Sequence, residues 1–217
     1  MTTQNMHPIR MALTKGRIEK GALELMERAG YGCVALHDKG RRLIVPTDGG
    51  ELEVVFAKAA DVITYVETGA CDIGIVGKDT ILECGSSFYE MADLNYGKCR
   101  MVLAAPIGSD FYSGYAARRI ASKYPKIAAD FFAKKQMDVK ILKIEGSVEL
   151  GPVLGMTDAI VDLVETGRTL AENGLEVIET VLQVSARLIV NIASLKLRKG
   201  DIEEIVERFN AVREVQI

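Results

Sequence analysis

The fold is indicated first by residues 159–170, which read AIVDLVETGRTL. The first half is a compact apolar run that is broken only by Asp162, and such runs are typical of strands buried on both faces. The second half carries the short loop Thr166-Gly167-Arg168-Thr169, which opens a helix. A buried strand that leads directly into a helix is the building block of α/β proteins with parallel sheets.

Apolar runs alternate with helical patterns on both sides of this segment. The expected strands are residues 9–13, 43–45, 52–56, 72–76, 101–105, 139–144, 159–164, 177–184 and 188–190, and the expected helices include residues 22–29, 61–66, 125–136, 148–154 and 192–215. So many elements in 217 residues are dense for one sheet. We therefore expect an α/β protein with parallel sheets and two lobes: residues 1–95 plus 190–217 (lobe I), and residues 96–189 (lobe II).

The composition is that of an ordinary globular protein. Apolar residues make up 48% of the chain and charged residues 26%, and the net charge of −3 argues against a bulk nucleic-acid binder. The four cysteines form no CxxC pair, which argues against a zinc or iron–sulfur site. The first residues lack the apolar core of a signal peptide, and no apolar run approaches membrane-spanning length. We expect a cytoplasmic protein that binds neither nucleic acid nor membrane.

The loop after the central strand has the features of a phosphate-binding turn. A helix start offers unpaired backbone N–H groups, and Gly167 lets a ligand approach the backbone closely. The hydroxyls of Thr166 and Thr169 are further donors. Asp162 stands near the carboxyl end of the strand, where ligands of open α/β sheets gather, and can accept hydrogen bonds from ribose hydroxyls. From these residues alone, a capped turn without a ligand remains the alternative.

The whole chain resembles the ATP phosphoribosyltransferases that begin histidine biosynthesis. Phosphoribosyltransferases share an apolar strand, acidic residues and then Thr-Gly-x-Thr, as this segment has. Six further blocks match in the family's order, which makes the resemblance specific. They are ALTKGR (residues 12–17), DVITYVETG (61–69), DIGIVGKD (72–79), GKCR (97–100), RIASKYP (119–125) and EGSVEL (145–150).

The resemblance implies a fold, a reaction and partners. The fold would be two α/β lobes with a ligand cleft between them, resembling type II periplasmic binding proteins. The enzyme would join ATP to phosphoribosyl pyrophosphate with Mg²⁺ that has no direct protein ligand. The short form would make a homodimer, and a hetero-octamer with a regulatory subunit related to histidyl-tRNA synthetase. Since this chain ends at Ile217 without room for a regulatory domain, histidine should not inhibit it alone.

The resemblance also implies site residues in each lobe. Lobe I would carry the ATP side and the turn that holds pyrophosphate, with Lys15 and Arg17 as catalytic cations. Lys58 and Arg100 are weaker candidates for binding ATP. Lobe II would carry the loop for the 5′-phosphate of phosphoribosyl pyrophosphate. The residues expected to bind this substrate are Asp158, Asp162, Glu165, Thr166, Gly167, Arg168, Thr169 and Glu145.

Glu145 and Glu149 flank the turn Gly146-Ser147 and could orient the ribose, although Glu149 could equally lie on a helix surface. Lys58 stands where many relatives have arginine. Lysine keeps the positive charge but cannot make the bidentate contact to a phosphate that arginine makes. Ile63 stands where proline is common, which we interpret as a difference in packing.

Four alternatives stay open from the sequence. Lys15 and Arg17 could be solvated surface cations. The chain could be a solute-binding protein of the same shape, although such proteins normally carry an export signal, or an inactive paralogue, although the acidic residue and the loop threonines are intact. A phosphoribosyltransferase for another base is the remaining enzyme alternative.

Overall fold

The computed structural model describes residues 7–85, 87–114 and 116–213. The chain divides into two compact units: unit 1 runs to Gly97 and resumes at Ser185, and unit 2 comprises Lys98–Val184. We expected the chain to return to the first lobe at residue 190. It returns before strand β11 (Ala186–Asn191), because this whole strand pairs with β4 and β5 in the sheet of unit 1.

Unit 1 is a six-stranded sheet with the order β2-β3-β1-β4-β11-β5. Strand β1 pairs in parallel with β3 and β4, whereas β11 is antiparallel to β4 and β5, and β2 to β3. The sheet therefore has the expected parallel strands at its centre but is mixed overall, because β11 and β2 run in the opposite direction. The other strands are β1 (Ile9–Thr14), β2 (Ile44–Pro46), β3 (Leu52–Ala57), β4 (Ile73–Gly77) and β5 (Phe88–Asp93).

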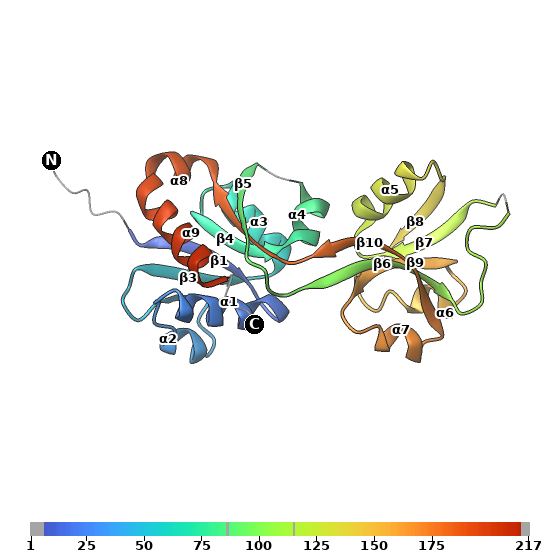
Figure 1. Ribbon diagram of the computed structural model, residues 1–217, viewed down its shortest axis with the longest axis horizontal. Helices are drawn as coiled ribbons and strands as arrows, with labels where there is room; N and C mark the ends of the chain where they lie inside the picture. Colours follow the sequence, from blue (N-terminus) through green and yellow to red (C-terminus); the bar gives the residue numbers. More distant parts are fainter. Residues whose placement is uncertain (1–6, 86, 115, 214–217) are drawn as a thin grey trace. The chain divides into compact units, whose positions relative to one another are not determined.

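Helices cover both faces of this sheet (Figure 1). Met11 and Leu13 of β1 pack in one apolar core with α1 and α9, and Ala12 packs in a second core with α3. Burial on both faces explains why the strand sequences are continuous apolar runs. The helices of unit 1 are α1 (Arg17–Arg28), α2 (Val34–His37), α3 (Ala59–Glu67), α4 (Lys78–Cys84), α8 (Ile192–Leu197) and α9 (Lys199–Arg213).

Unit 2 is a five-stranded sheet with the order β10-β6-β9-β7-β8. Strand β9 (Ala159–Val164) lies at its centre, parallel to β7 (Arg118–Ser122) and antiparallel to β6 (Cys99–Pro106). Ile160 and Val164 of β9 pack against Leu170, which anchors the short helix α7 to the strand. The remaining elements are β8 (Val139–Lys143), β10 (Leu175–Val184), α5 (Pro125–Lys134), α6 (Leu150–Val153) and α7 (Arg168–Glu172).

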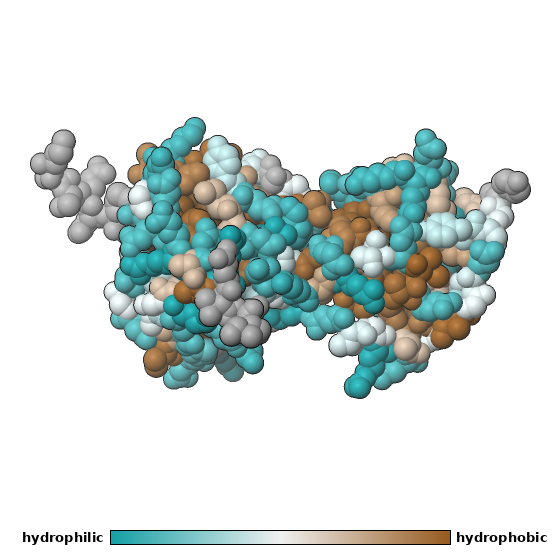
Figure 2. Space-filling model, viewed as in Figure 1, coloured by the Kyte–Doolittle hydropathy of each residue, from teal (hydrophilic) through white to brown (hydrophobic). Residues whose placement is uncertain are grey.

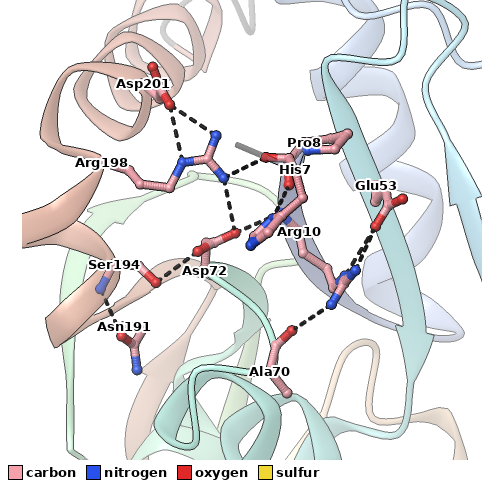
Figure 3. Close-up of polar contacts among 10 residues, drawn as sticks. All are labelled: His7, Pro8, Arg10, Glu53, Ala70, Asp72, Asn191, Ser194, Arg198 and Asp201. Carbon is pink, nitrogen blue, oxygen red and sulfur yellow. Dashed lines mark hydrogen bonds and ion pairs between the residues drawn. The ribbon is translucent and has the colours of Figure 1, made fainter. Parts of the chain in front are cut away.

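A group of charged and polar residues around the buried Asp72 connects α8 and α9 to the sheet of unit 1 (Figure 3). Asp72 precedes β4, and its carboxylate accepts hydrogen bonds from the Arg10 backbone N–H at 2.9 Å and from Ser194 Oγ at 2.8 Å. Arg198 Nη1 lies 3.7 Å from the same carboxylate, and Arg198 Nη2 lies 3.0 Å from Asp201 Oδ2. We call these five residues the Asp72 network.

Hydrophobic residues reach the surface over a larger area of unit 2 than of unit 1 in the view of Figure 2. The exposed apolar side chains of unit 2 include Leu150, Val153, Leu154 and Met156 in and after α6. Across residues 7–85, 87–114 and 116–213, every helix is too short or too polar to cross a bilayer.

Candidate functional site

A sharp turn joins β9 to α7. Gly167 has φ +80°, in the left-handed region that only glycine adopts without strain, and directly precedes the helix. The Arg168 backbone N–H lies 3.4 Å from Thr166 Oγ1, so the threonine side chain folds over the start of the helix. The expected glycine-bearing turn between strand and helix is therefore present.

A pocket of about 200 Å³ opens at this turn, and we call it the loop pocket. Acidic, hydroxyl and apolar side chains line it together with Gly167. Its lining consists of Glu149, Asp162, Leu163, Val164, Glu165, Thr166, Gly167, Thr169 and Leu170. The structure thus brings the loop threonines and Asp162 to one cavity, together with Glu149 from the start of α6.

Asp162 is the half-buried acid of the loop pocket. Burial raises the pKa of its carboxyl to about 6, although a hydrogen bond from the Leu163 backbone N–H lowers this pKa. The Glu149 carboxylate raises this pKa further, whereas the Lys123 ammonium lowers it. The Asp162 side chain is therefore mostly ionised above about pH 6 and mostly protonated below it.

Other expected residues of lobe II lie away from the loop pocket. Asp158 precedes β9, at the opposite end of the strand, where it accepts hydrogen bonds from the backbone and the guanidinium of Arg119 at 2.7 and 3.2 Å. Glu145 is exposed, and its ion pair with Lys143 at 2.7 Å lowers its carboxyl pKa. The structure therefore separates Asp158 from the loop, and Glu149 lines the pocket where Glu145 does not. Arg168 begins α7 but does not line the pocket.

The second group of expected residues lies at the carboxyl edge of the parallel strands of unit 1. Lys15 follows β1 and Lys58 follows β3, and the Lys15 backbone N–H donates to the Ala57 carbonyl at 2.9 Å. The register pairs Thr14 with Ala57, so the two lysines leave the sheet side by side. We call this place the Lys15 edge.

Further contacts shape the turn of the Lys15 edge. Gly16 has φ +88°, and its N–H donates to Glu19 Oε2 at 3.3 Å. The Lys39 ammonium binds Glu19 Oε1 and lies 4.1 Å from the centre of the Phe56 ring. Burial and the neighbouring Lys15 ammonium lower the pKa of Lys39. The Lys15 edge therefore concentrates positive charge.

Arg17 and Arg100 occupy different surroundings. Arg17 begins α1, and its Nη1 donates a hydrogen bond to the Gly97 carbonyl, just before the chain enters unit 2. Arg100 belongs to β6 of unit 2, where it stands opposite Val164 at the end of β9. Lys15, Arg17 and Lys58 thus share unit 1, whereas Arg100 neighbours the loop in unit 2.

Sequence reasoning missed Asp79, the second residue of α4. It is 6% exposed, and its Oδ1 has no hydrogen-bond partner in the part of the chain that the structure describes. Thr80 Oγ1 lies 3.5 Å from Oδ2. An available signal was its place in residues 72–79, where an acid closely follows a buried apolar strand. Asp79 is therefore a candidate acceptor beside the end of β4.

Comparisons with known proteins identify a matching family model and similar sequences. The family model described as HisG, ATP phosphoribosyltransferase, matches residues 58–211. The ATP phosphoribosyltransferase of Clostridium kluyveri is 54% identical over 200 residues, which are 92% of this chain and 91% of the relative. That of Clostridium botulinum is 52% identical over 209 residues, 95% of this chain and 99% of the relative.

Two solved structures share the fold. One is the ATP phosphoribosyl transferase (HisG:HisZ) complex from Thermotoga maritima, with a TM-score of 0.80 and 29% identity over 96% of this chain and 100% of the other. The other is the alkanesulfonate-binding protein SsuA from Xanthomonas axonopodis pv. citri, with a TM-score of 0.57 and 10% identity over 95% and 73%. The second likeness concerns the fold alone, and confirms the expected resemblance to type II periplasmic binding proteins.

Proposed function

The chain belongs to the ATP phosphoribosyltransferase family and catalyses the first step of histidine biosynthesis, and we propose a role for each unit in it. In this reaction the phosphoribosyl group of phosphoribosyl pyrophosphate moves to N1 of ATP, and pyrophosphate leaves. The loop pocket binds the 5′-phosphate and the ribose, and the Lys15 edge acts on the phosphates of ATP and pyrophosphate. The observation that carries this proposal is that Asp162, Thr166 and Thr169 line one pocket.

The loop pocket suits a ribose 5-phosphate group. The Thr166 and Thr169 hydroxyls and the N–H groups of the turn donate to phosphate oxygens, and Gly167 keeps the backbone accessible. When ionised, the carboxylates of Asp162 and Glu149 are hydrogen-bond acceptors, so they can accept from the hydroxyls of the ribose. The hydroxyls hold one end of the ligand and the carboxylates the other, which orients the carbon that reacts.

The Lys15 edge suits the charge that develops on pyrophosphate. As the bond to the ribose carbon breaks, the leaving oxygen gains negative charge, which a positioned cation stabilises more strongly than it stabilises the bound substrate. Lys15 and Lys58 provide such cations at adjacent strand ends. Positioning and electrostatic stabilisation are sufficient for this chemistry, and covalent catalysis is not required.

We expect Mg²⁺ to enter with the substrate. Among the described residues there is no group of three or more His, Cys, Asp or Glu side chains that could hold a metal ion. Mg²⁺ commonly binds substrate phosphates and water with few protein ligands. When bound, it would neutralise charge on the pyrophosphate oxygens.

We also propose that the enzyme is cytoplasmic and that its substrates are ATP and phosphoribosyl pyrophosphate. The chain would form a homodimer, and a hetero-octamer with a regulatory subunit related to histidyl-tRNA synthetase. The Thermotoga maritima HisG:HisZ complex supports a partner of this kind. An assay of both substrates with the purified chain, with and without a candidate regulatory subunit, tests the proposal. Absence of phosphoribosyl-ATP in both cases would contradict it.

Thr169→Ala should weaken binding of phosphoribosyl pyrophosphate by about tenfold or more, because a hydrogen bond to a charged phosphate oxygen is lost. Calorimetric titration and the KM for this substrate measure the effect. Thr64→Ala is the control, since Thr64 is an exposed threonine on α3 in unit 1. Unchanged binding and turnover in Thr169→Ala would remove the loop from the site.

The kcat/KM for phosphoribosyl pyrophosphate should fall as the pH drops below about 6. The pKa of Asp162 is raised to about 6, so below this pH its carboxyl gains a proton and loses acceptor capacity. A substrate phosphate ionises in the same pH range, so the pH profile of the wild type must be compared with that of Asp162→Asn to isolate the effect of Asp162.

The Asn variant should be roughly 10- to 100-fold less active at pH 8, where wild-type Asp162 is ionised, and should retain the wild-type melting temperature. The fall of its kcat/KM below about pH 6 should also be less steep than that of the wild type. Full activity combined with a lower melting temperature would show that Asp162 is a structural residue.

A further inference from the structure

The loop pocket carries negative charge, although its proposed ligand is an anion. Glu149, Asp162 and Glu165 line it, and none of the described lining residues is lysine or arginine. A phosphate monoester carries a charge of about −1.5 to −2 at pH 7. Three carboxylates next to this charge would oppose binding, and a cation from outside the lining would offset their repulsion.

The sheet register places Lys123 beside the pocket. Strand β7 is parallel to β9 and pairs its last residue, Ser122, with Val161, so the next residues along the chain are Lys123, directly after β7, and Asp162 in β9. Neighbouring strands lie about 4.8 Å apart, and parallel strands end at the same edge of a sheet. Lys123 therefore leaves the sheet at the edge where the loop pocket opens.

Three hydrogen bonds hold the backbone at this point. Ser122 Oγ donates to the Val161 carbonyl at 2.6 Å and accepts from the Tyr124 N–H at 2.9 Å. The Ser122 carbonyl accepts from the Ile144 N–H at 3.0 Å. The start of the Lys123 side chain is thus fixed, while its ammonium can move.

The Lys123 ammonium is available for a ligand. It has no hydrogen-bond or ion-pair partner within residues 7–85, 87–114 and 116–213, although it lowers the carboxyl pKa of Asp162 and of Glu145. Two cations of β7 and β8 are engaged elsewhere: Lys143 pairs with Glu145, and Arg119 pairs with Asp158 at the far end of β9.

We propose that the Lys123 ammonium contacts phosphate oxygens of phosphoribosyl pyrophosphate bound in the loop pocket and supplies the positive charge that the lining lacks. This inference rests on the proposed function of the pocket. It adds a substrate-binding residue that follows a different strand, within residues 119–125.

Titration calorimetry of Lys123→Ala and Lys123→Arg tests the inference. Lys123→Ala should bind phosphoribosyl pyrophosphate about tenfold more weakly, with a smaller dependence on salt, because one charge-assisted contact is lost. Lys123→Arg should recover most of the affinity. The control is Lys126→Ala, because Lys126 is exposed on α5 and pairs with Asp130 at 3.2 Å. ATP affinity should not change in any variant.

Ribose 5-phosphate as a second probe identifies the phosphate. Weaker binding of both probes assigns Lys123 to the 5′-phosphate, and weaker binding of phosphoribosyl pyrophosphate alone assigns it to the pyrophosphate; either result supports the inference. If Thr169→Ala weakens binding but Lys123→Ala does not, the pocket stands and the inference fails. If neither variant differs from wild type, both the pocket and the inference are wrong.

Discussion

Lys15→Ala should lower kcat and kcat/KM together by about 10²- to 10³-fold, the loss typical of one removed contact to developing charge. The Lys15 backbone is fixed by its hydrogen bond to Ala57, and Lys58 and Lys39 lie close by. Such a cluster of cations attracts the pyrophosphate most strongly when the leaving oxygen has gained charge. Steady-state and single-turnover kinetics with saturating ATP measure the effect.

Lys20→Ala is the matched control for this experiment. Lys20 is an exposed lysine on α1 whose ammonium lies 3.8 Å from Glu24, and both kinetic constants should stay at wild-type values. Arg17→Ala is a less direct test, because the Arg17 guanidinium also binds the Gly97 carbonyl. If Lys15→Ala raises KM only and keeps the single-turnover rate, Lys15 binds substrate but does not act on the leaving group.

The fold class could be predicted because burial on both faces is written into the strands. Residues 9–13 and 159–164 are apolar runs for this reason. The sequence analysis missed β5 and β7: β5 is an edge strand with several exposed residues, and β7 begins with two arginines. The crossing at Ser185 was also missed, because β10 and β11 are separated by a single residue and only their partners distinguish them.

The candidate site could be predicted where its residues are close in sequence. Asp162 and Thr169 reach one pocket because a single strand and turn carry both. Asp158 lies four residues before Asp162, a spacing that would place the two side chains together on a helix. The residues between them form a strand instead, so Asp158 lies at the opposite end of β9. Lys123 lies near this pocket because β7 pairs with β9. No local sequence pattern reveals that pairing.

Arg198→Ala should lower the free energy of unfolding by about 3–5 kcal/mol, since it removes one partner of a buried ion pair. The Arg198 side chain is 11% exposed and the Asp72 side chain 8%. Without the guanidinium, the contacts of the Asp72 carboxylate that remain among the described residues are those to the Arg10 N–H and Ser194 Oγ (Figure 3). Urea unfolding followed by circular dichroism measures the change.

The matched control is Lys199→Ala, one residue further along the chain. Lys199 pairs with Glu203 at 3.6 Å, but the two side chains are 70% and 51% exposed, so its loss should cost at most about 0.5 kcal/mol. Asp72→Asn combined with Arg198→Ala separates charge from packing, because the double variant leaves no uncompensated charge. If buried charge is the cause, the double variant should be more stable than Arg198→Ala alone. If both are equally unstable, the packing of the Arg198 side chain between α9 and the start of β1 holds this part of unit 1 together.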